Sequence, residues 1–239
     1  MLVQILTLFP EMFTGPFQSS IIKRAQEQGL VEFRIWNFRD YTTDRHRTVD
    51  DVPYGGGDGM VLKPEPILHC LKAVRKDTPP AKVVLLTPQG ELFKQPIAKE
   101  LASEGHLIFI CGHYEGFDER IRSWADRELS IGDYVLTGGE LAAMVVSDAV
   151  IRLMPGALGS ITSAETDSFT GNVLEYPQYT RPFEFEGMTV PEILLSGHHA
   201  RIEEWRRKQA LLRTAIRRPD LLKDLSLSID EKEFLKENQ

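Results

Sequence analysis

Three short segments of the 239-residue sequence combine glycine with residues that could contact a ligand. TPQG at 87–90 and CGHYEG at 111–116 each follow an apolar run, and IGDYVLTGG at 131–139 precedes a helix-like segment. Glycine at such places permits either a tight turn or a close approach of the backbone to a ligand. Ligands of parallel α/β sheets bind beyond the carboxyl ends of the strands. Three such loops, about one strand–helix unit apart, therefore favour a shared pocket over separate turns.

The side chains in and beside these loops indicate what the pocket would hold. Neither a GxGxxG fingerprint after the first strand nor a GxxxxGK[ST] loop occurs, which disfavours a dinucleotide-dependent oxidoreductase and phosphate binding in general. The glycine segment PYGGGDGM at 53–60 has no lysine at the required place. The loops instead carry Pro88, Tyr114, Phe117, Tyr134 and Leu136. Such residues suit a flat, neutral ring held by backbone hydrogen bonds, so a nucleoside fits better than a nucleotide.

Four apolar runs predict the strands that must position these loops. They are LVQILTLF at 2–9, VEFRIWNF at 31–38, KVVLLTP at 82–88 and HLIFICG at 106–112. Helix-like segments lie between several of them. This alternation predicts an α/β domain with a mostly parallel sheet.

A helix is expected to begin at Glu140, directly after the third loop. Its apolar residues fall on two adjacent rows, which together predict a broad core-facing stripe. The rows are Leu141, Val145, Ala149 and Leu153, and Ala142, Val146, Val150 and Met154. Pro155 and Gly156 are expected to stop this helix. The small, polar residues that follow, 156–172, resemble a linker, so we place a domain boundary near residue 160.

A second amphipathic helix is expected from about 198 to Pro219. Ile202, Trp205, Gln209, Leu212 and Ile216 follow helical spacing. Residues 198–223 hold eight Lys and Arg against three acidic residues, a local charge of +5 in a chain of net charge −7. A basic surface of this kind either binds a polyanion or is a solvated helix face.

The two cysteines and the N-terminus bear on the compartment. Cys70 and Cys111 lie in apolar contexts, which favours buried, reduced thiols over a disulfide or a metal pair. The N-terminal segment lacks a basic leader, and no run approaches the roughly 20 apolar residues of a membrane span. We therefore expect a cytoplasmic protein that does not enter a membrane.

Taken together, the motifs closely resemble the bacterial tRNA (guanine-N1)-methyltransferase family, TrmD, of the SPOUT superfamily. The resemblance runs from Leu2 past Pro219 and is carried, in order, by PYGGGDGM, LLTPQG, CGHYEGFDER, SIGDYVLTGGE, DSF, YPQYTRP and SGHHARIEEWRRKQAL. It implies a mostly parallel sheet with a C-terminal trefoil knot that binds S-adenosyl-L-methionine. It also implies a homodimer with active sites at the interface, and methylation of the guanosine that directly follows the anticodon of tRNA.

The resemblance further implies three parts of the chain. These are a catalytic, cofactor-binding domain at 1–159, a flexible interdomain loop at 160–175, and a small all-helical tRNA-binding domain at 176–239. Matching motif positions nominate the cofactor-binding residues Pro88, Gly112, Tyr114, Glu115, Gly116, Ile131, Gly132, Tyr134, Leu136, Gly138 and Gly139. Ser163, Arg206 and Lys208 are nominated for tRNA.

Methylation of guanine N1 defines two catalytic roles. N1 carries a proton at neutral pH, so a general base must remove it, and a cation near O6 would stabilise the charge that develops. The resemblance assigns these roles to Asp167 and Arg152. Taken alone, Arg152 would read as the partner of Asp148 in a surface pair near a helix end, and Asp167 as a solvated loop residue.

Two departures from the family pattern concern a metal ion and a loop. Thr166 stands where many members carry an acid, and Asp58 stands in the glycine segment where Pro or Ala is usual. A role for Mg²⁺ stays open, although no ligand spacing in the sequence supports a protein-made metal site. The alternatives to the guanine-N1 reading are a SPOUT methyltransferase acting at another RNA position and a non-catalytic RNA-binding regulator.

Overall fold

A computed structural model describes residues 1–159, 167–223 and 225–238 of the chain. The chain divides into two compact units, Met1–Ile161 and Thr162–Gln239. Ser163 and Thr166 lie outside the described residues. No helix in the described ranges is long and apolar enough to cross a membrane.

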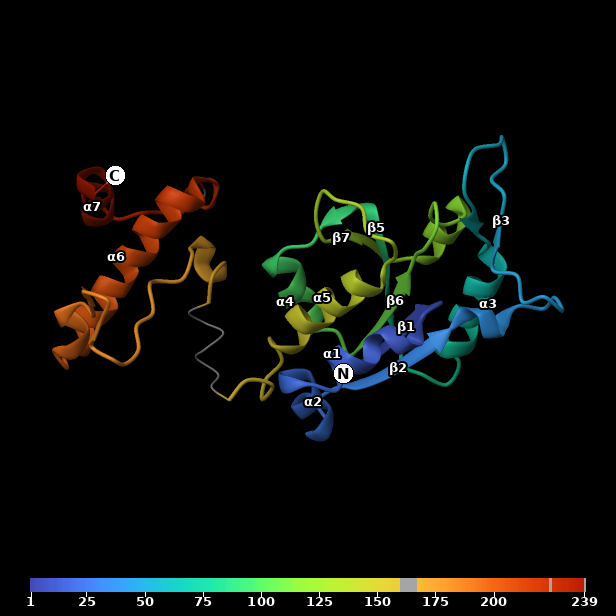
Figure 1. Ribbon diagram of the computed structural model, residues 1–239, viewed down its shortest axis with the longest axis horizontal. Helices are drawn as coiled ribbons and strands as arrows, with labels where there is room; N and C mark the ends of the chain where they lie inside the picture. Colours follow the sequence, from blue (N-terminus) through green and yellow to red (C-terminus); the bar gives the residue numbers. More distant parts are fainter. Residues whose placement is uncertain (160–166, 224, 239) are drawn as a thin grey trace. The chain divides into compact units, whose positions relative to one another are not determined.

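The N-terminal unit is built on a five-stranded sheet in which all neighbouring strands are parallel (Figure 1). Its strands are β1 (Leu2–Thr7), β2 (Glu32–Asn37), β5 (Lys82–Leu92), β6 (His106–Cys111) and β7 (Arg127–Ser130), in the order β2-β1-β6-β5-β7. The predicted α/β class with a mostly parallel sheet is confirmed, and each of the four apolar runs forms a strand. β7, which is short and begins with the charged residues Arg127 and Glu128, was not predicted.

Helices cover both faces of this sheet, because alternate strand residues point to opposite sides. Val3, Val84 and Phe109 pack in one core cluster with α1 (Thr14–Phe17), α2 (Ser20–Glu27), α4 (Gln95–Ala102) and α5 (Glu140–Ile151). Leu85 and Ile108 pack in a second cluster with α3 (Pro64–Arg75) and the 3-10 helices η2 (Phe38–Tyr41) and η3 (Glu119–Trp124). Strand β6 is buried along its whole length.

Strand β5 leaves the sheet for a few residues and then returns. Leu86 and Glu91 both pair with Leu129 of β7, so residues 87–90 form an excursion between two pairings with the same strand. A Cβ atom at Gly90 would lie 2.5 Å from the backbone nitrogen of Leu129. The chains therefore pass too closely at this point for any side chain, and the excursion needs glycine there.

Helix α5 ends earlier and buries a narrower face than the sequence predicts. It ends at Ile151, with Arg152 as the C-cap, because the following backbone bonds are of the tighter i to i+3 kind. The row Ala142, Val146 and Val150 is buried as predicted. Leu141 and Val145, by contrast, are 47% and 48% exposed, so the described residues 1–159 leave their side of the helix largely uncovered.

Two further short elements flank the glycine segment at 53–60. β3 (Asp50–Asp51) and β4 (Val61–Leu62) pair antiparallel and bring its ends together. A further 3-10 helix of this unit, η1 (Pro10–Phe13), follows β1.

The C-terminal unit is mainly helical but not all-helical. It contains η5 (Thr170–Asn172), β8 (Glu184–Phe185), β9 (Met188–Thr189), η6 (Glu192–Leu195), α6 (His199–Arg217), η7 (Pro219–Leu222) and α7 (Ile229–Asn238). The prediction of a purely helical unit is wrong because β8 and β9 form a hairpin. Glu186 and Gly187 both have positive φ angles, which suit the tight turn of a two-residue hairpin.

Helix α6 confirms the predicted helix before Pro219, but its buried face is rotated from the predicted stripe. The buried residues are Ile202, Ala210, Leu211 and Thr214. Ile216 is 66% exposed. The cause is the segment before the hairpin, which packs on the other side of the last turns: Leu174 donates its N–H to Oγ1 of Thr214 at 2.8 Å.

Candidate functional site

A cavity of about 450 Å³ opens at the carboxyl ends of β5, β6 and β7. The residues that line it come mainly from the three glycine-bearing loops. All eleven residues nominated for the cofactor take part: Pro88, Gly112, Tyr114, Glu115, Gly116, Ile131, Gly132, Tyr134, Leu136, Gly138 and Gly139. The expectation that the three loops share a pocket is confirmed.

The Gly138–Gly139 pair forms a wall of backbone against the end of β6. Gly139 donates its N–H to the carbonyl of Gly112 at 2.9 Å, and Gly138 bridges to His113. A Cβ atom at Gly139 would lie 2.8 Å from the Cα atom of Cys111. A side chain does not fit here, so the cavity meets main chain at this point.

The third loop folds back on itself through Tyr134. Its N–H donates to the carbonyl of Gly132 at 2.9 Å, and its hydroxyl donates to the carbonyl of Ile131 at 3.2 Å. A Cβ atom at Gly132 would lie 2.4 Å from the Tyr134 ring. The glycine thus makes room for the aromatic ring at the cavity wall.

The second loop is tied to the glycine segment at 53–60. Glu115 donates its N–H to the carbonyl of Met60 at 3.0 Å, and its side chain lies over Gly59, where a Cβ atom would be 2.5 Å from Cγ of Glu115. Tyr114 adopts a positive φ of 58° at the turn. Burial, and then the carboxylate of Asp50, raise the pKa of Tyr114.

A buried carboxylate supports the start of α5 behind the cavity. Glu140 is 2% exposed, and its Oε1 accepts a hydrogen bond from the Thr7 hydroxyl at 2.6 Å. The same hydroxyl accepts the N–H of Phe9 at 2.9 Å. The first turn of a helix favours negative charge, which helps to compensate the burial of this group.

His113 presents a polar atom whose bonding is incomplete. Within the described residues, its Nδ1 is buried and has no hydrogen-bond partner. The ring packs between Phe9, at a centroid distance of 4.9 Å, and Tyr114, at 4.7 Å. A buried polar atom beside a cavity is a natural contact for a polar ligand.

Sequence reasoning missed about half of the lining residues. They are Leu86, Thr87, Gln89, His113, Glu119, Arg122, Leu129, Ser130, Val135, Thr137 and Ala142. Most are neighbours of the nominated residues in the same loops and could have been included by taking each loop whole. Glu119 and Arg122 belong to η3, beyond the second loop, and the only signal for them was their spacing of three residues.

The residues nominated for catalysis belong to different units. Arg152 is the C-cap of α5, where its N–H donates to the carbonyl of Asp148 at 3.1 Å. Asp167 lies in the C-terminal unit, before η5, and its carbonyl accepts the N–H of Thr170 at 3.1 Å. Both residues are half-buried.

The residues nominated for tRNA lie on α6, except for Ser163. Arg206 pairs with Glu203 at 2.6 Å and lies over the ring of Tyr176, and Lys208 pairs with Glu204 at 2.7 Å. Ion pairs of this partly exposed kind contribute little to stability. Both cations can therefore exchange their carboxylate for a phosphate at small cost.

Neither cysteine lines the cavity. Cys70 and Cys111 are buried and free, as the sequence predicts. Burial raises the pKa of the Cys70 thiol to about 12, with a smaller contribution from Asp40. In the ranges 1–159, 167–223 and 225–238, no group of three or more His, Cys, Asp or Glu side chains is placed to hold a metal ion.

Comparisons with known proteins identify the family of this chain. The family model for tRNA (guanine-1)-methyltransferase, TrmD, matches residues 1–224. A tRNA (guanine-N(1)-)-methyltransferase of Dictyoglomus turgidum is 58% identical over 235 residues, which cover 98% of this chain and 95% of the relative. The enzyme of the same name from Bacillus cereus strain G9842 is 59% identical over 239 residues, 99% of this chain and 98% of the relative. The chain therefore belongs to the tRNA (guanine-1)-methyltransferase family, TrmD.

Proposed function

We propose that this protein methylates N1 of guanosine 37 in tRNA, beside the anticodon, with S-adenosyl-L-methionine as the methyl donor. One observation carries the proposal: all eleven positions nominated by the family motifs surround a single cavity in a chain that matches the family over residues 1–224. The related enzymes named above act, by their names, on guanine N1 of tRNA.

The cavity fits the proposed methyl donor in size and chemistry. Its volume lies within the range of about 300–1,000 Å³ that is typical of small-molecule sites. The glycine wall at 138–139 admits close contact with a nucleoside, and the lining combines backbone polar groups with apolar and aromatic side chains. The buried Nδ1 of His113 gives a polar ligand group a partner. When bound, the donor supplies an electrophilic methyl group on a sulfonium.

In the proposed reaction, Asp167 is the general base. Guanine N1 cannot attack the methyl group until its proton leaves, and a carboxylate placed beside N1 can accept that proton. Arg152 is proposed to donate hydrogen bonds to guanine O6, where negative charge collects as the proton leaves. The same guanidinium could select guanine, because arginine pairs readily with O6 and N7 of this base.

The C-terminal unit is proposed to hold the tRNA. The basic residues of α6, among them Arg206 and Lys208, suit phosphate contacts, which position a nucleic acid without reading its sequence. Ser163 is proposed as a further substrate contact. We retain the proposed parts at 1–159, 160–175 and 176–239, with the middle part as the interdomain loop.

A trefoil knot and a homodimer with active sites at its interface complete the proposal. The knot is proposed on the match to the family over residues 1–224. The dimer is supported by Leu141 and Val145, two exposed apolar side chains one turn apart on α5. Apolar side chains that project from a helix next to a ligand cavity suit a contact with a second copy.

The test is transfer of a radiolabelled methyl group to two tRNA transcripts that differ only at position 37, with guanosine or adenosine. We expect label on the guanosine transcript alone, and digestion to nucleosides should recover it as N1-methylguanosine. Label on a ribose hydroxyl or at another position would identify a different RNA methyltransferase. Tight tRNA binding without any transfer would identify a regulator instead.

A further inference from the structure

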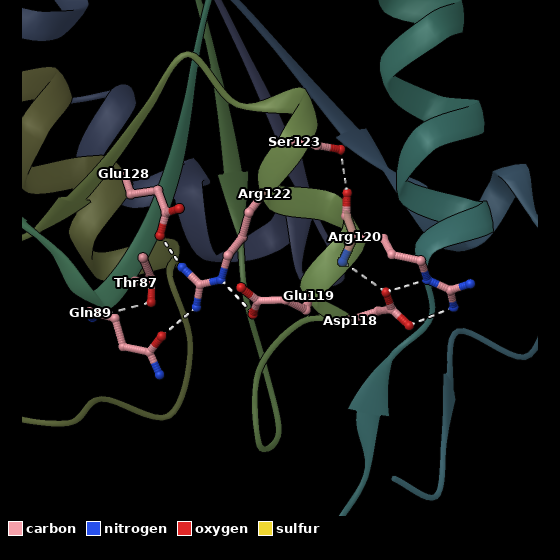
Figure 2. A network of polar contacts seen from close by, with 8 residues as sticks. All are labelled: Thr87, Gln89, Asp118, Glu119, Arg120, Arg122, Ser123 and Glu128. Atoms are coloured by element: carbon pink, nitrogen blue, oxygen red, sulfur yellow. Dashed lines mark hydrogen bonds and ion pairs between the residues drawn. The ribbon is translucent and has the colours of Figure 1, made fainter. Parts of the chain in front are cut away.

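The guanidinium of Arg122 joins three parts of the cavity wall (Figure 2). Its Nε donates to Oε2 of Glu119 at 2.8 Å. Its Nη1 donates to Oε2 of Glu128, and its Nη2 donates to Oε1 of Gln89. One side chain thus contacts η3, strand β7 and the β5 excursion at once.

These contacts connect the loops that form the cavity. Gln89 lies in the excursion at 87–90, and Glu128 lies in β7, which leads directly into the third loop. Arg122, Glu119 and Gln89 also line the cavity themselves. The planar guanidinium is suited to this task, because it presents its donors in a fixed fork, whereas a lysine ammonium offers one point of charge.

The Arg122 side chain is only 21% exposed, so solvent competes less for its bonds than at the protein surface. Arg120, on the same 3-10 helix, offers a direct contrast. It is 71% exposed and pairs with Asp118, only two residues away, at 2.7 Å. Its contact stays within one short segment and does not reach the other loops.

We propose that Arg122 is a positioning residue for the methyl donor: it fixes the β5 excursion against η3 and β7, and so preforms the cavity. This inference rests on the proposed function, since it assumes that the cavity holds the donor. In a preformed site, binding carries no free-energy cost for ordering the loops. Loss of Arg122 therefore weakens donor binding even where the residue does not contact the donor.

The experiment measures binding of S-adenosyl-L-homocysteine by calorimetry to the full-length protein, four single variants and one double variant. We expect Arg122→Ala to raise Kd about tenfold, which corresponds to one or two lost hydrogen bonds. Arg122→Lys should recover only part of this loss, and the matched control Arg120→Ala should stay within about twofold of the parent. Gln89→Ala should weaken binding less than Arg122→Ala, because two of the three contacts remain.

The double variant Arg122→Ala with Gln89→Ala separates positioning from a general structural role. If Arg122 acts through Gln89, adding Gln89→Ala to Arg122→Ala costs less than it costs in the parent protein. In methyl-transfer assays, the KM for the donor should rise more than kcat falls. Thermal unfolding without ligand checks that each variant is folded.

Each outcome bears on a distinct claim. Equal affinity of the parent and the folded Arg122→Ala protein would overturn the positioning role, as would full additivity of the two substitutions. Failure of the parent protein to bind S-adenosyl-L-homocysteine would instead contradict the proposed function.

Discussion

Glycines shape the cavity because they have no side chain. Gly138 and Gly139 lie where the start of α5 passes the end of β6. A Cβ atom at Gly139 would meet the main chain of Cys111 and Gly112, and one at Gly138 would meet the Glu140 carboxylate. A ligand at this wall would meet backbone N–H and C=O groups, whose positions are set by the sheet. The affinity of the site should therefore respond sharply to the smallest side chain at either glycine.

Gly139→Ala tests this dependence. The added methyl group would lie 2.8 Å from Cα of Cys111, so the turn must move into the cavity. We expect at least a tenfold loss of affinity for S-adenosyl-L-homocysteine by calorimetry, which corresponds to about 1.4 kcal/mol. Gly105→Ala is the matched control, because nothing lies within 4 Å of its Cβ position. Unchanged affinity in the folded Gly139→Ala protein would refute the glycine wall.

The proposed base is tested by Asp167→Asn, which keeps the size of the side chain and removes its basicity. Methyl transfer should fall by at least about a hundredfold, the usual contribution of a general base. Affinity for S-adenosyl-L-homocysteine should change little, because Asp167 is not among the residues lining the described cavity. Transfer at the parental rate in single-turnover experiments would remove Asp167 from the mechanism.

At the scale of elements, the position of α5 depends on a contact with Thr7, at the carboxyl end of β1. The buried carboxylate of Glu140 accepts the Thr7 hydroxyl, so the helix that closes the cavity is held by the first strand of the sheet. A buried charge that loses a partner is costly, because no water replaces the missing hydrogen bond. This contact should therefore matter for stability.

Thr7→Val removes the hydroxyl with little change in volume. We expect it to lower the free energy of unfolding by about 1–3 kcal/mol, the usual cost of leaving a buried polar group unsatisfied. Denaturant titration followed by circular dichroism measures this change. Thr7→Ser retains the hydroxyl and should recover most of the loss. If valine and serine destabilise equally, lost packing rather than the hydrogen bond is responsible.

The comparison of sequence and structure is also clearest for elements. Apolar runs were sufficient to predict β1, β5 and β6, because buried parallel strands need continuous hydrophobic sequence. The run that forms β2, an edge strand without a buried residue, is interrupted by Glu32 and Arg34 and was still long enough to predict a strand. Apolar runs could not reveal β7, which has four residues and two charges. The outward row of α5 reads as core in the sequence, since periodicity reports that a face is apolar but not what covers it.

The cavity was predictable in part for a related reason. Glycines after strands located its loops, and the family motifs named eleven lining residues. Arg122 was not predicted, because its role comes from contacts with two residues outside its own helix. Gln89 is distant from it in sequence, and Glu128 lies on strand β7. Such contacts follow from the topology of the sheet, and the local pattern of residues does not encode them.

For the whole molecule, charge is distributed unevenly. The chain carries −7 in total, whereas residues 198–223 carry +5. A polyanion would be repelled by much of the protein and attracted by this region, which helps to orient an RNA before specific contacts form. The interaction should weaken with added salt, because phosphate contacts release counterions.

Arg206→Ala combined with Lys208→Ala tests this region. We expect weaker tRNA binding in filter assays, and a plot of log affinity against log salt that is shallower by about one to two units, one for each lost phosphate contact. Lys23→Ala is a matched control, because Lys23 is an exposed lysine in an i,i+4 pair with Glu27 on α2. A salt dependence identical to that of the parent protein would place the RNA on another surface.

The excursion of β5 limits how a ligand can enter. The residues on both sides of 87–90, Leu86 and Glu91, pair with Leu129 of β7. This segment therefore cannot move outward without breaking its pairing with the edge strand. The stretch 131–139 has no such double attachment to a strand, and Val135 at its tip is highly exposed. Ligands should therefore enter and leave the cavity beside residues 131–139, whereas residues 87–90 form a fixed part of its wall.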